Sequence, residues 1–157
     1  MFTDYKTGKP LSSGKKAQTR DAALLKAVKN GTKLQAAVYA LSQPGAVGRY
    51  LYIDPSIEAD CTEFAVEHDS AAAEAARVSA ALLTTALQQG VLLPRLFDHK
   101  GSIPNACEYC DVKAACSQGD TGVTLRLQRV FETLRERSGE SPLALQLWDI
   151  GVEGEGV

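Results

Sequence analysis

The tripeptide Asp4-Tyr5-Lys6 combines a carboxylate and an ammonium group at a spacing of two residues. Residues 2–6 alternate apolar and polar side chains, which predicts a strand, and residues two apart on a strand project to the same face. We therefore expect Asp4 and Lys6 to lie side by side. A carboxylate can bind Mg²⁺ or Mn²⁺, which polarises a phosphate, and an ammonium group can neutralise the developing charge. The pair suits phosphodiester hydrolysis; an ordinary surface ion pair is the alternative.

Gln35 and Tyr39 form a second pair of polar side chains, in a segment whose apolar residues have helical spacing. Residues at positions i and i+4 of a helix lie one above the other, and Thr32 is placed to cap this helix. An amide and a phenol arranged in this way can reach a phosphate, a metal-bound water or a nucleic-acid backbone. The alternative is that Tyr39 fills the core and Gln35 is solvated.

Three of the four cysteines, Cys107, Cys110 and Cys116, form a C-x2-C-x5-C pattern. Two thiolates in a C-x-x-C segment can turn back onto one metal, and the third follows closely enough to join them. Such soft ligands suit zinc or an iron–sulfur cluster. The alternative is three buried free thiols. Cys61 lies between two predicted strands and is expected to be a small buried or loop residue.

The elements that must position these groups follow from periodicity and from helix-breaking residues. The predicted order is typical of an α/β or α+β layer structure with a small mixed sheet flanked by helices. After the strand at residues 2–6, we expect helices at 21–29 and 34–41, an antiparallel pair of strands at 47–53 and 62–68, a helix at 71–89 capped by Ser70, a loop at 94–104, the Cys-rich loop at 107–116, a helix at 124–137 and a flexible tail at 138–157.

Length and composition exclude several classes of protein. The chain has 157 residues, of which 45% are hydrophobic, and a net charge of −2, which fits one domain and excludes a wholly disordered chain. The sequence has no apolar stretch suited to a membrane span and no hydrophobic signal core after Met1. Because clustered cysteines are typical of metal sites in reducing compartments, we expect a cytoplasmic protein without membrane contact.

Charge is distributed unevenly along the chain. Residues 1–33 carry eight Lys or Arg against two Asp, a balance of +6, whereas residues 34–157 carry nine basic and seventeen acidic residues, a balance of −8. The basic segment, with Lys9, Lys15 and Lys16, can steer a polyanion such as DNA, and a solvated lysine-rich loop is the alternative. His68 and His99 are each flanked by charged residues and are expected at the surface.

Taken together, Asp4-Tyr5-Lys6-Thr7-Gly8-Lys9 and the later Leu34-Gln35-x-x-x-Tyr39-Ala40 resemble the RecB-type branch of the PD-(D/E)XK nucleases. The resemblance implies that residues 1–137 are the C-terminal part of a restriction-endonuclease-like core. It implies that Asp4 and the backbone carbonyl of Tyr5 bind Mg²⁺ or Mn²⁺ and that Lys6 is catalytic. Gln35 and Tyr39 would support this site and contact DNA.

The cysteine pattern after this core is similar to the iron–sulfur staple of AddB-type helicase–nucleases and CRISPR-associated adaptation nucleases, where a fourth Cys before the core completes a 4Fe–4S cluster. No Cys or family-type acidic residue precedes Asp4 here. The resemblance implies a DNA exonuclease or helicase-associated nuclease domain in DNA repair or recombination, with a helicase subunit or domain as partner. The alternative is a catalytically incomplete DNA-binding or scaffolding remnant stabilised by an iron–sulfur or zinc site, and we expect this chain alone to be poorly active.

Overall fold

The computed structural model describes residues 1–93, 105–117, 119–137 and 142–150. These residues form two compact units, one built from residues 1–81 and the other from the described residues between 82 and 150. The chain is mixed α/β, with a small three-stranded sheet flanked by helices, as the sequence predicted. Within the described ranges, no helix is long and apolar enough to cross a membrane.

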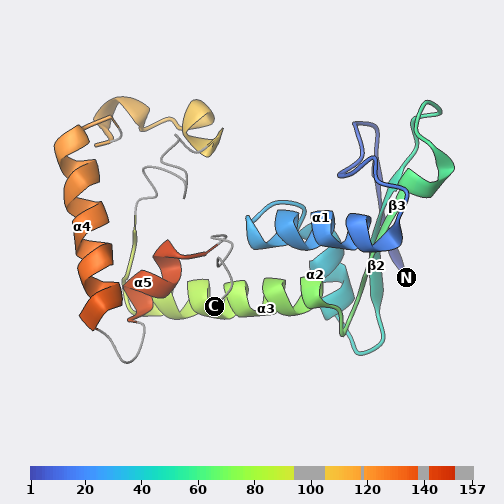
Figure 1. The fold of residues 1–157 in the computed structure, drawn as a ribbon. Helices are drawn as coiled ribbons and strands as arrows, with labels where there is room; N and C mark the ends of the chain where they lie inside the picture. Colours follow the sequence, from blue (N-terminus) through green and yellow to red (C-terminus); the bar gives the residue numbers. More distant parts are fainter. Residues whose placement is uncertain (94–104, 118, 138–141, 151–157) are drawn as a thin grey trace. The chain divides into compact units, whose positions relative to one another are not determined.

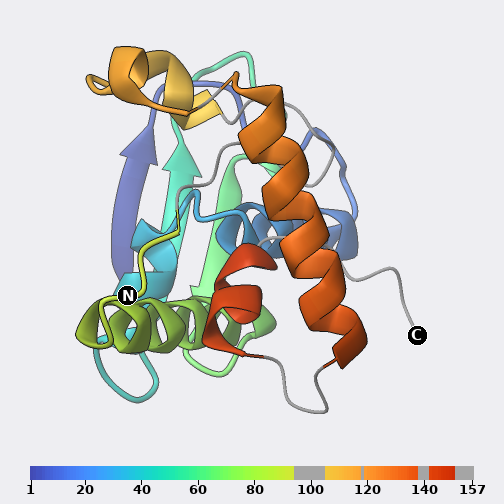
Figure 2. The same ribbon diagram turned by 90° about the vertical axis from the view of Figure 1, so that its left-hand side faces the viewer.

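The sheet of the first unit has the strand order β1-β2-β3. Strand β1 (Phe2–Lys6) runs parallel to β2 (Val47–Tyr52), and β2 runs antiparallel to β3 (Glu63–Glu67), as Figure 2 shows. The three predicted strands are therefore confirmed, although β2 and β3 are slightly shorter than expected. The parallel pairing places the carboxyl ends of β1 and β2 at the same edge of the sheet.

Three helices pack on one face of this sheet (Figure 1). Helix α1 (Ala17–Lys29) begins earlier than the predicted start at residue 21, whereas α2 (Gln35–Leu41) and α3 (Ala71–Gln88) lie close to their predicted positions. Their apolar faces and the inward-facing side chains of β2 and β3 form one core, because alternate residues of a strand point to the same side. This core contains Leu24, Val28, Ala36, Ala37, Ala40, Tyr50, Tyr52, Phe64, Val66, Ala72, Ala73 and Ala76.

Gly48 allows α2 to approach β2 closely. A Cβ atom at this position would lie 2.0 Å from the carbonyl oxygen of Ala36, a distance at which the helix or the strand would have to move. The small side chains of Ala36, Ala37 and Ala40, all fully buried, complete the contact from the helix side. Because Gly48 has no side chain and the alanines of α2 have small ones, α2 lies close to the sheet. This close approach places the polar residues of α2 near β1.

The opposite face of the sheet is more polar. Arg49 of β2 donates from Nε to Thr3 Oγ1 at 2.9 Å and from Nη1 to Glu63 Oε1 at 3.0 Å. These contacts connect all three strands across the face that α1, α2 and α3 leave free. Gly48 and Tyr50, on either side of Arg49 in the sequence, face the core. The alternation of side chains along β2 therefore gives the sheet an apolar face, covered by helices, and a charged face.

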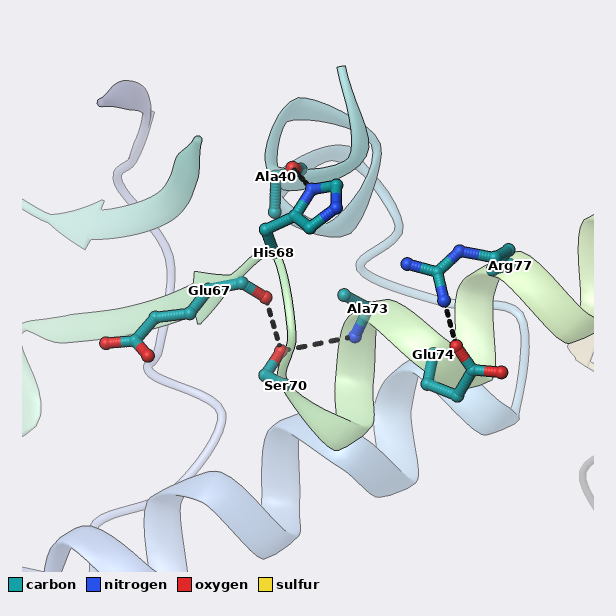
Figure 3. Close-up of polar contacts among 7 residues, drawn as sticks. All are labelled: Ala40, Glu67, His68, Ser70, Ala73, Glu74 and Arg77. Carbon is teal, nitrogen blue, oxygen red and sulfur yellow. Dashed lines mark hydrogen bonds and ion pairs between the residues drawn. The ribbon is translucent and has the colours of Figure 1, made fainter. Parts of the chain in front are cut away.

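The junction between β3 and α3 fixes the far end of α2 (Figure 3). Ser70 Oγ accepts from the Ala73 amide at 3.3 Å and donates to the Glu67 carbonyl at 2.7 Å, so its predicted role as a helix cap is confirmed. His68 was expected at the surface, but it is half-buried and its Nδ1 lies 2.9 Å from the Ala40 carbonyl oxygen. A carbonyl can only accept, so Nδ1 carries the proton in this contact.

The second unit contains the end of α3, two short turns of 3-10 helix, α4 (Thr121–Arg137) and α5 (Leu143–Trp148). Helix α4 begins before the predicted residue 124, because Asp120 Oδ1 accepts from the Val123 amide at 3.0 Å and caps it there. The stretch from 142 to 150 was expected to be a flexible tail but includes α5. Its Trp148 ring stacks on Phe131 with centroids 4.1 Å apart.

Some expectations fall on residues outside those described. The predicted loop at 94–104, with His99, is one of them, and the remaining parts of the predicted tail, 138–141 and 151–157, are others.

Candidate functional site

Asp4 and Lys6 lie on the helix-covered face of β1, so their expected proximity is confirmed. Lys6 Nζ is 2.9 Å from Asp4 Oδ2, and the two side chains are 28% and 16% exposed. The contact with the Asp4 carboxylate, at hydrogen-bond distance, raises the pKa of Lys6 above its ordinary value, while burial acts in the opposite direction. Lys6 is therefore a cation at neutral pH, held in place beside a carboxylate at the edge of the sheet.

Gln35 joins this pair from the first turn of α2. Lys6 Nζ donates a hydrogen bond to Gln35 Oε1 at 3.2 Å. Because the ammonium group has three donors, contacts with Asp4 and Gln35 together fix its direction and leave donor capacity for a further acceptor. Gln35 lies on a helix, as the sequence predicted, and the structure brings it to the Asp4–Lys6 pair.

Helix α2 is held at this place by a residue of β2. The Tyr50 hydroxyl accepts a hydrogen bond from the Ala36 amide at 3.1 Å, one of the amides that have no partner within the helix itself. The sequence predicted Thr32 as the cap, and this was wrong: its hydroxyl donates to the Ala27 carbonyl at 2.9 Å instead. The cap is supplied from another element, which a local sequence pattern cannot reveal.

Lys33 adds a second cation near the site. Its Nζ lies 5.9 Å from the centroid of the Tyr50 ring, and Lys6 Nζ lies 5.4 Å from the same centroid, both within the range of cation–π attraction. Lys33 has a φ of 54°, in the left-handed region that costs a non-glycine residue about 1–2 kcal/mol. The two ammonium groups make this part of the surface favourable for an anion.

Sequence reasoning missed Tyr50 and Tyr52, and it placed Lys33 only within the basic segment of residues 1–33. The alternation of residues 47–53 was a signal for the two tyrosines, because it places both on the core side of β2, opposite Asp4 and Lys6 in the parallel register. For Lys33 the sequence carries no such signal, since its position depends on an unusual backbone conformation.

Two other predicted site residues lie differently from Gln35. Tyr39 stands near the opposite end of α2, where its ring packs on Phe2 with centroids 5.7 Å apart. The Tyr5 side chain is 63% exposed on the other face of β1, so only its backbone carbonyl remains for the predicted metal contact. The Asp4–Lys6–Gln35 group is therefore the part of the predicted site that side-chain contacts bring together.

The predicted DNA-binding lysines lie on the loop between β1 and α1. Lys9 and Lys16 are exposed, whereas Lys15 Nζ is 2.8 Å from Glu58 Oε2. Hydrogen bonding to this carboxylate raises the pKa of Lys15. Because both partners are more than half exposed, the pair is weak and open to competition from a phosphate.

Cys107, Cys110 and Cys116 are half-buried in the second unit, on two short turns joined by hydrogen bonds between backbone groups. Cys61 belongs to the first unit and is buried, with its Sγ 3.9 Å from the Gly14 carbonyl oxygen, as expected for a small buried residue. The sequence thus identified the environment of Cys61, while a metal at the other three cysteines stays a prediction.

The described side chains offer few ligands to a metal ion. Among the residues that the structure describes, no group of three or more His, Cys, Asp or Glu side chains is arranged to hold a metal ion. Mg²⁺ and Mn²⁺ prefer several oxygen ligands, and Asp4 contributes one carboxylate. The described side chains therefore do not complete a divalent-cation site, nor do the three thiols form a ready cluster site.

Comparison of the chain with protein families, with curated proteins and with solved structures found no match.

Proposed function

We propose that this protein is a DNA nuclease domain of the RecB type, in which Asp4, Lys6 and Gln35 bind and orient a phosphodiester. The observation that carries the proposal is the position of Lys6 Nζ, between Asp4 Oδ2 at 2.9 Å and Gln35 Oε1 at 3.2 Å. This arrangement joins the two motifs on which the resemblance rests. It makes the ammonium group a fixed donor at the end of a strand, where it can stabilise negative charge on a phosphate.

Each residue has a distinct part in this proposal. Lys6 donates to a phosphate oxygen, Gln35 keeps the ammonium group from turning away, and Asp4 holds it from the other side. A bound divalent cation would polarise the phosphate and acidify an attacking water. Because the described carboxylates do not complete a cation site, cleavage requires acidic ligands beyond Asp4. The proposed setting is the cytoplasm, in repair or recombination, with a helicase as partner.

The test is cleavage of end-labelled single- and double-stranded DNA by this protein in Mg²⁺ or Mn²⁺. We expect slow cleavage by the wild type, and we expect Lys6→Ala to lower the rate at least about a hundredfold. DNA affinity should stay within about threefold. The control is Lys113→Ala, which removes an exposed lysine of the second unit. Full activity of Lys6→Ala would refute the catalytic assignment.

A second candidate function is DNA binding without cleavage, as a scaffolding domain. It is favoured by the absence of a three-ligand acidic group among the described residues. In this case the protein cleaves DNA with neither metal but still binds it. Replacing Lys9, Lys15 and Lys16 by Ala should then weaken binding and reduce the slope of log K against log salt by about one for each lysine that contacts a phosphate. An unchanged slope would show that this loop is not the DNA path.

A further inference from the structure

Lys33 has an unusual backbone conformation close to the Asp4–Lys6–Gln35 group. Its φ of 54° lies in the left-handed region, where the Cβ atom of any residue other than glycine crowds the following carbonyl oxygen. Within the described part of the chain, Lys33 is the one non-glycine residue with a positive φ. Its neighbour Gly31 adopts the same region, with a φ of 73°, without that steric penalty. A lysine at a position that suits glycine better indicates that its side chain has a role outside folding.

The turn that carries Lys33 is fixed to the end of α1 by hydrogen bonds. The Gly31 amide donates to the Val28 carbonyl at 2.9 Å. The Thr32 amide donates to the Ala27 carbonyl, also at 2.9 Å, and the two bonds together form the pattern that ends a helix at a left-handed glycine. The Thr32 hydroxyl adds a second hydrogen bond to the same Ala27 oxygen. Because Thr32 is anchored in this way, the left-handed conformation of Lys33 determines where its side chain leaves the turn.

The Lys33 side chain extends to the same aromatic ring as Lys6. Its Nζ lies 5.9 Å from the centroid of the Tyr50 ring, and Lys6 Nζ lies 5.4 Å from that centroid. Both ammonium groups are therefore within about 6 Å of one point, the range of cation–π attraction. Phosphates of one nucleic-acid strand follow one another about every 3.4 Å along the helix axis. A strand with one phosphate at Lys6 therefore has further phosphates within reach of a second ammonium group nearby.

The two lysines differ in how their charge is balanced. Lys6 Nζ is 2.9 Å from Asp4 Oδ2, so this pair carries no net charge. Lys33 is half-buried, and no described carboxylate forms an ion pair with it. An ammonium group that has lost part of its water without gaining a carboxylate is stabilised by binding an anion. Lys33 therefore supplies the net positive charge of this part of the surface, whereas Lys6 supplies a donor of fixed direction.

We infer that Lys33 is a phosphate-binding residue of this site, and that it contacts a phosphate next to the one that Lys6 contacts. The ligand is then a strand with at least two successive phosphates, and the strained turn serves to hold the second cation in place. The inference rests on the proposed function in naming this strand as DNA. Binding at Lys33 does not depend on cleavage, so the two can fail separately.

The first experiment measures binding of a fluorescein-labelled thymidine decamer by fluorescence anisotropy, in EDTA so that metal-dependent cleavage does not occur. We expect Lys33→Ala to lower the affinity about five- to tenfold and to reduce the slope of log K against log salt by about 0.7, the value for one phosphate contact on a single strand. Lys33→Arg keeps the charge and should bind within about twofold of wild type. The matched control is Lys29→Ala, which removes an exposed lysine of the same basic segment. Unchanged affinity of Lys33→Ala, or equal losses in Lys33→Ala and Lys29→Ala, would overturn the inference.

The second experiment separates the charge of Lys33 from its backbone conformation. Lys33→Gly removes the ammonium group and relieves the left-handed strain, whereas Lys33→Ala removes the group and keeps the strain. We expect Lys33→Gly to bind the decamer as weakly as Lys33→Ala, although its folding equilibrium constant, measured by chemical denaturation, is at least about threefold higher. Weak binding by the more stable variant cannot result from unfolding. Wild-type affinity of Lys33→Gly would overturn the inference.

Cleavage by the wild type decides the proposed function independently of these results. If Lys33→Ala weakens binding as expected and the wild type cleaves DNA in neither Mg²⁺ nor Mn²⁺, the inference is supported and the nuclease function is not. If the wild type cleaves DNA and Lys33→Ala keeps its full affinity, the proposed function stands and the role of Lys33 is refuted.

Discussion

Lys6 and Gln35 are 29 residues apart in the chain, yet their side chains meet at 3.2 Å between Nζ and Oε1. This contact joins the end of a strand to the first turn of a helix. Its existence depends on the close approach of α2 to the sheet at Gly48 and on the cap that Tyr50 provides. Each of these two supports can be removed by a single substitution.

Replacement of Gln35 by Ala removes the amide acceptor and allows the Lys6 ammonium group to turn toward solvent. We expect the rate constant for cleavage at saturating DNA to fall about tenfold, because a misoriented group loses part of its effect. DNA affinity should change little, as measured by fluorescence anisotropy. Gln43→Ala, at an exposed position after α2, is the matched control. Equal losses in the two variants would exclude a specific role for Gln35.

Gly48→Ala should destabilise the first unit strongly, because the new methyl group meets the Ala36 carbonyl and forces α2 away from β2. Overpacking of this kind costs about 3 kcal/mol in the free energy of unfolding. Chemical denaturation followed by circular dichroism measures it. Gly8→Ala is the control, since nothing lies within 4 Å of a Cβ at that position. Similar stabilities for the two variants would contradict the packing described here.

Tyr50→Phe removes the hydroxyl that caps α2 and leaves the buried Ala36 amide without a partner. We expect the free energy of unfolding to fall by about 1–2 kcal/mol. Amide hydrogen exchange of residues 35–41 should accelerate more than that of α1. In the comparison variant, Tyr5→Phe, an exposed hydroxyl is lost and stability should stay within about 0.5 kcal/mol. Uniform acceleration across both helices would argue against a local cap.

The ion pair of Lys6 predicts a dependence of stability on alkaline pH. Because the pKa of Lys6 is raised in the folded protein, the contribution of the pair is fully present below the ordinary value of 10.5 and is lost as pH rises through the folded pKa. The difference in free energy of unfolding between wild type and Lys6→Met should therefore be constant near neutral pH and shrink above about pH 10.5. If the difference in free energy of unfolding between the two proteins grows with pH in this alkaline range, the raised pKa of Lys6 is refuted. Burial also raises the pKa values of Tyr50 and Tyr52, but both proteins share that effect.

The cysteine pattern predicts a cofactor that purification can reveal. We expect anaerobically purified protein to be brown, with broad visible absorption from an iron–sulfur cluster, and Cys110→Ser to lose the colour. Cys61→Ala should keep the colour, since this buried thiol contacts Gly14. Colourless protein with about one zinc per chain would favour the zinc alternative. Protein free of both metals would indicate that the three cysteines are ordinary thiols.

Several features could be predicted from the sequence because they depend on neighbouring residues. Strand alternation placed Asp4 beside Lys6, and the structure has them 2.9 Å apart. Ser70 was identified as a cap because an N-cap hydroxyl bonds to an amide three residues later. The prediction of Thr32 failed because a carbonyl of α1 offered its hydroxyl a nearer partner. His68 was misplaced because flanking charges do not reveal a buried acceptor such as the Ala40 carbonyl.

The sequence by itself determined which polar groups share a strand face or a helix turn, since side-chain direction within an element follows from backbone geometry. Only the tertiary structure decided that Lys6 finds Gln35, that Tyr50 caps α2 and that Tyr52 lies diagonal to Asp4. These relationships join residues on different elements. They depend on the parallel register of β1 with β2 and on how closely a helix packs against a glycine, and both are set by the packing of the whole core.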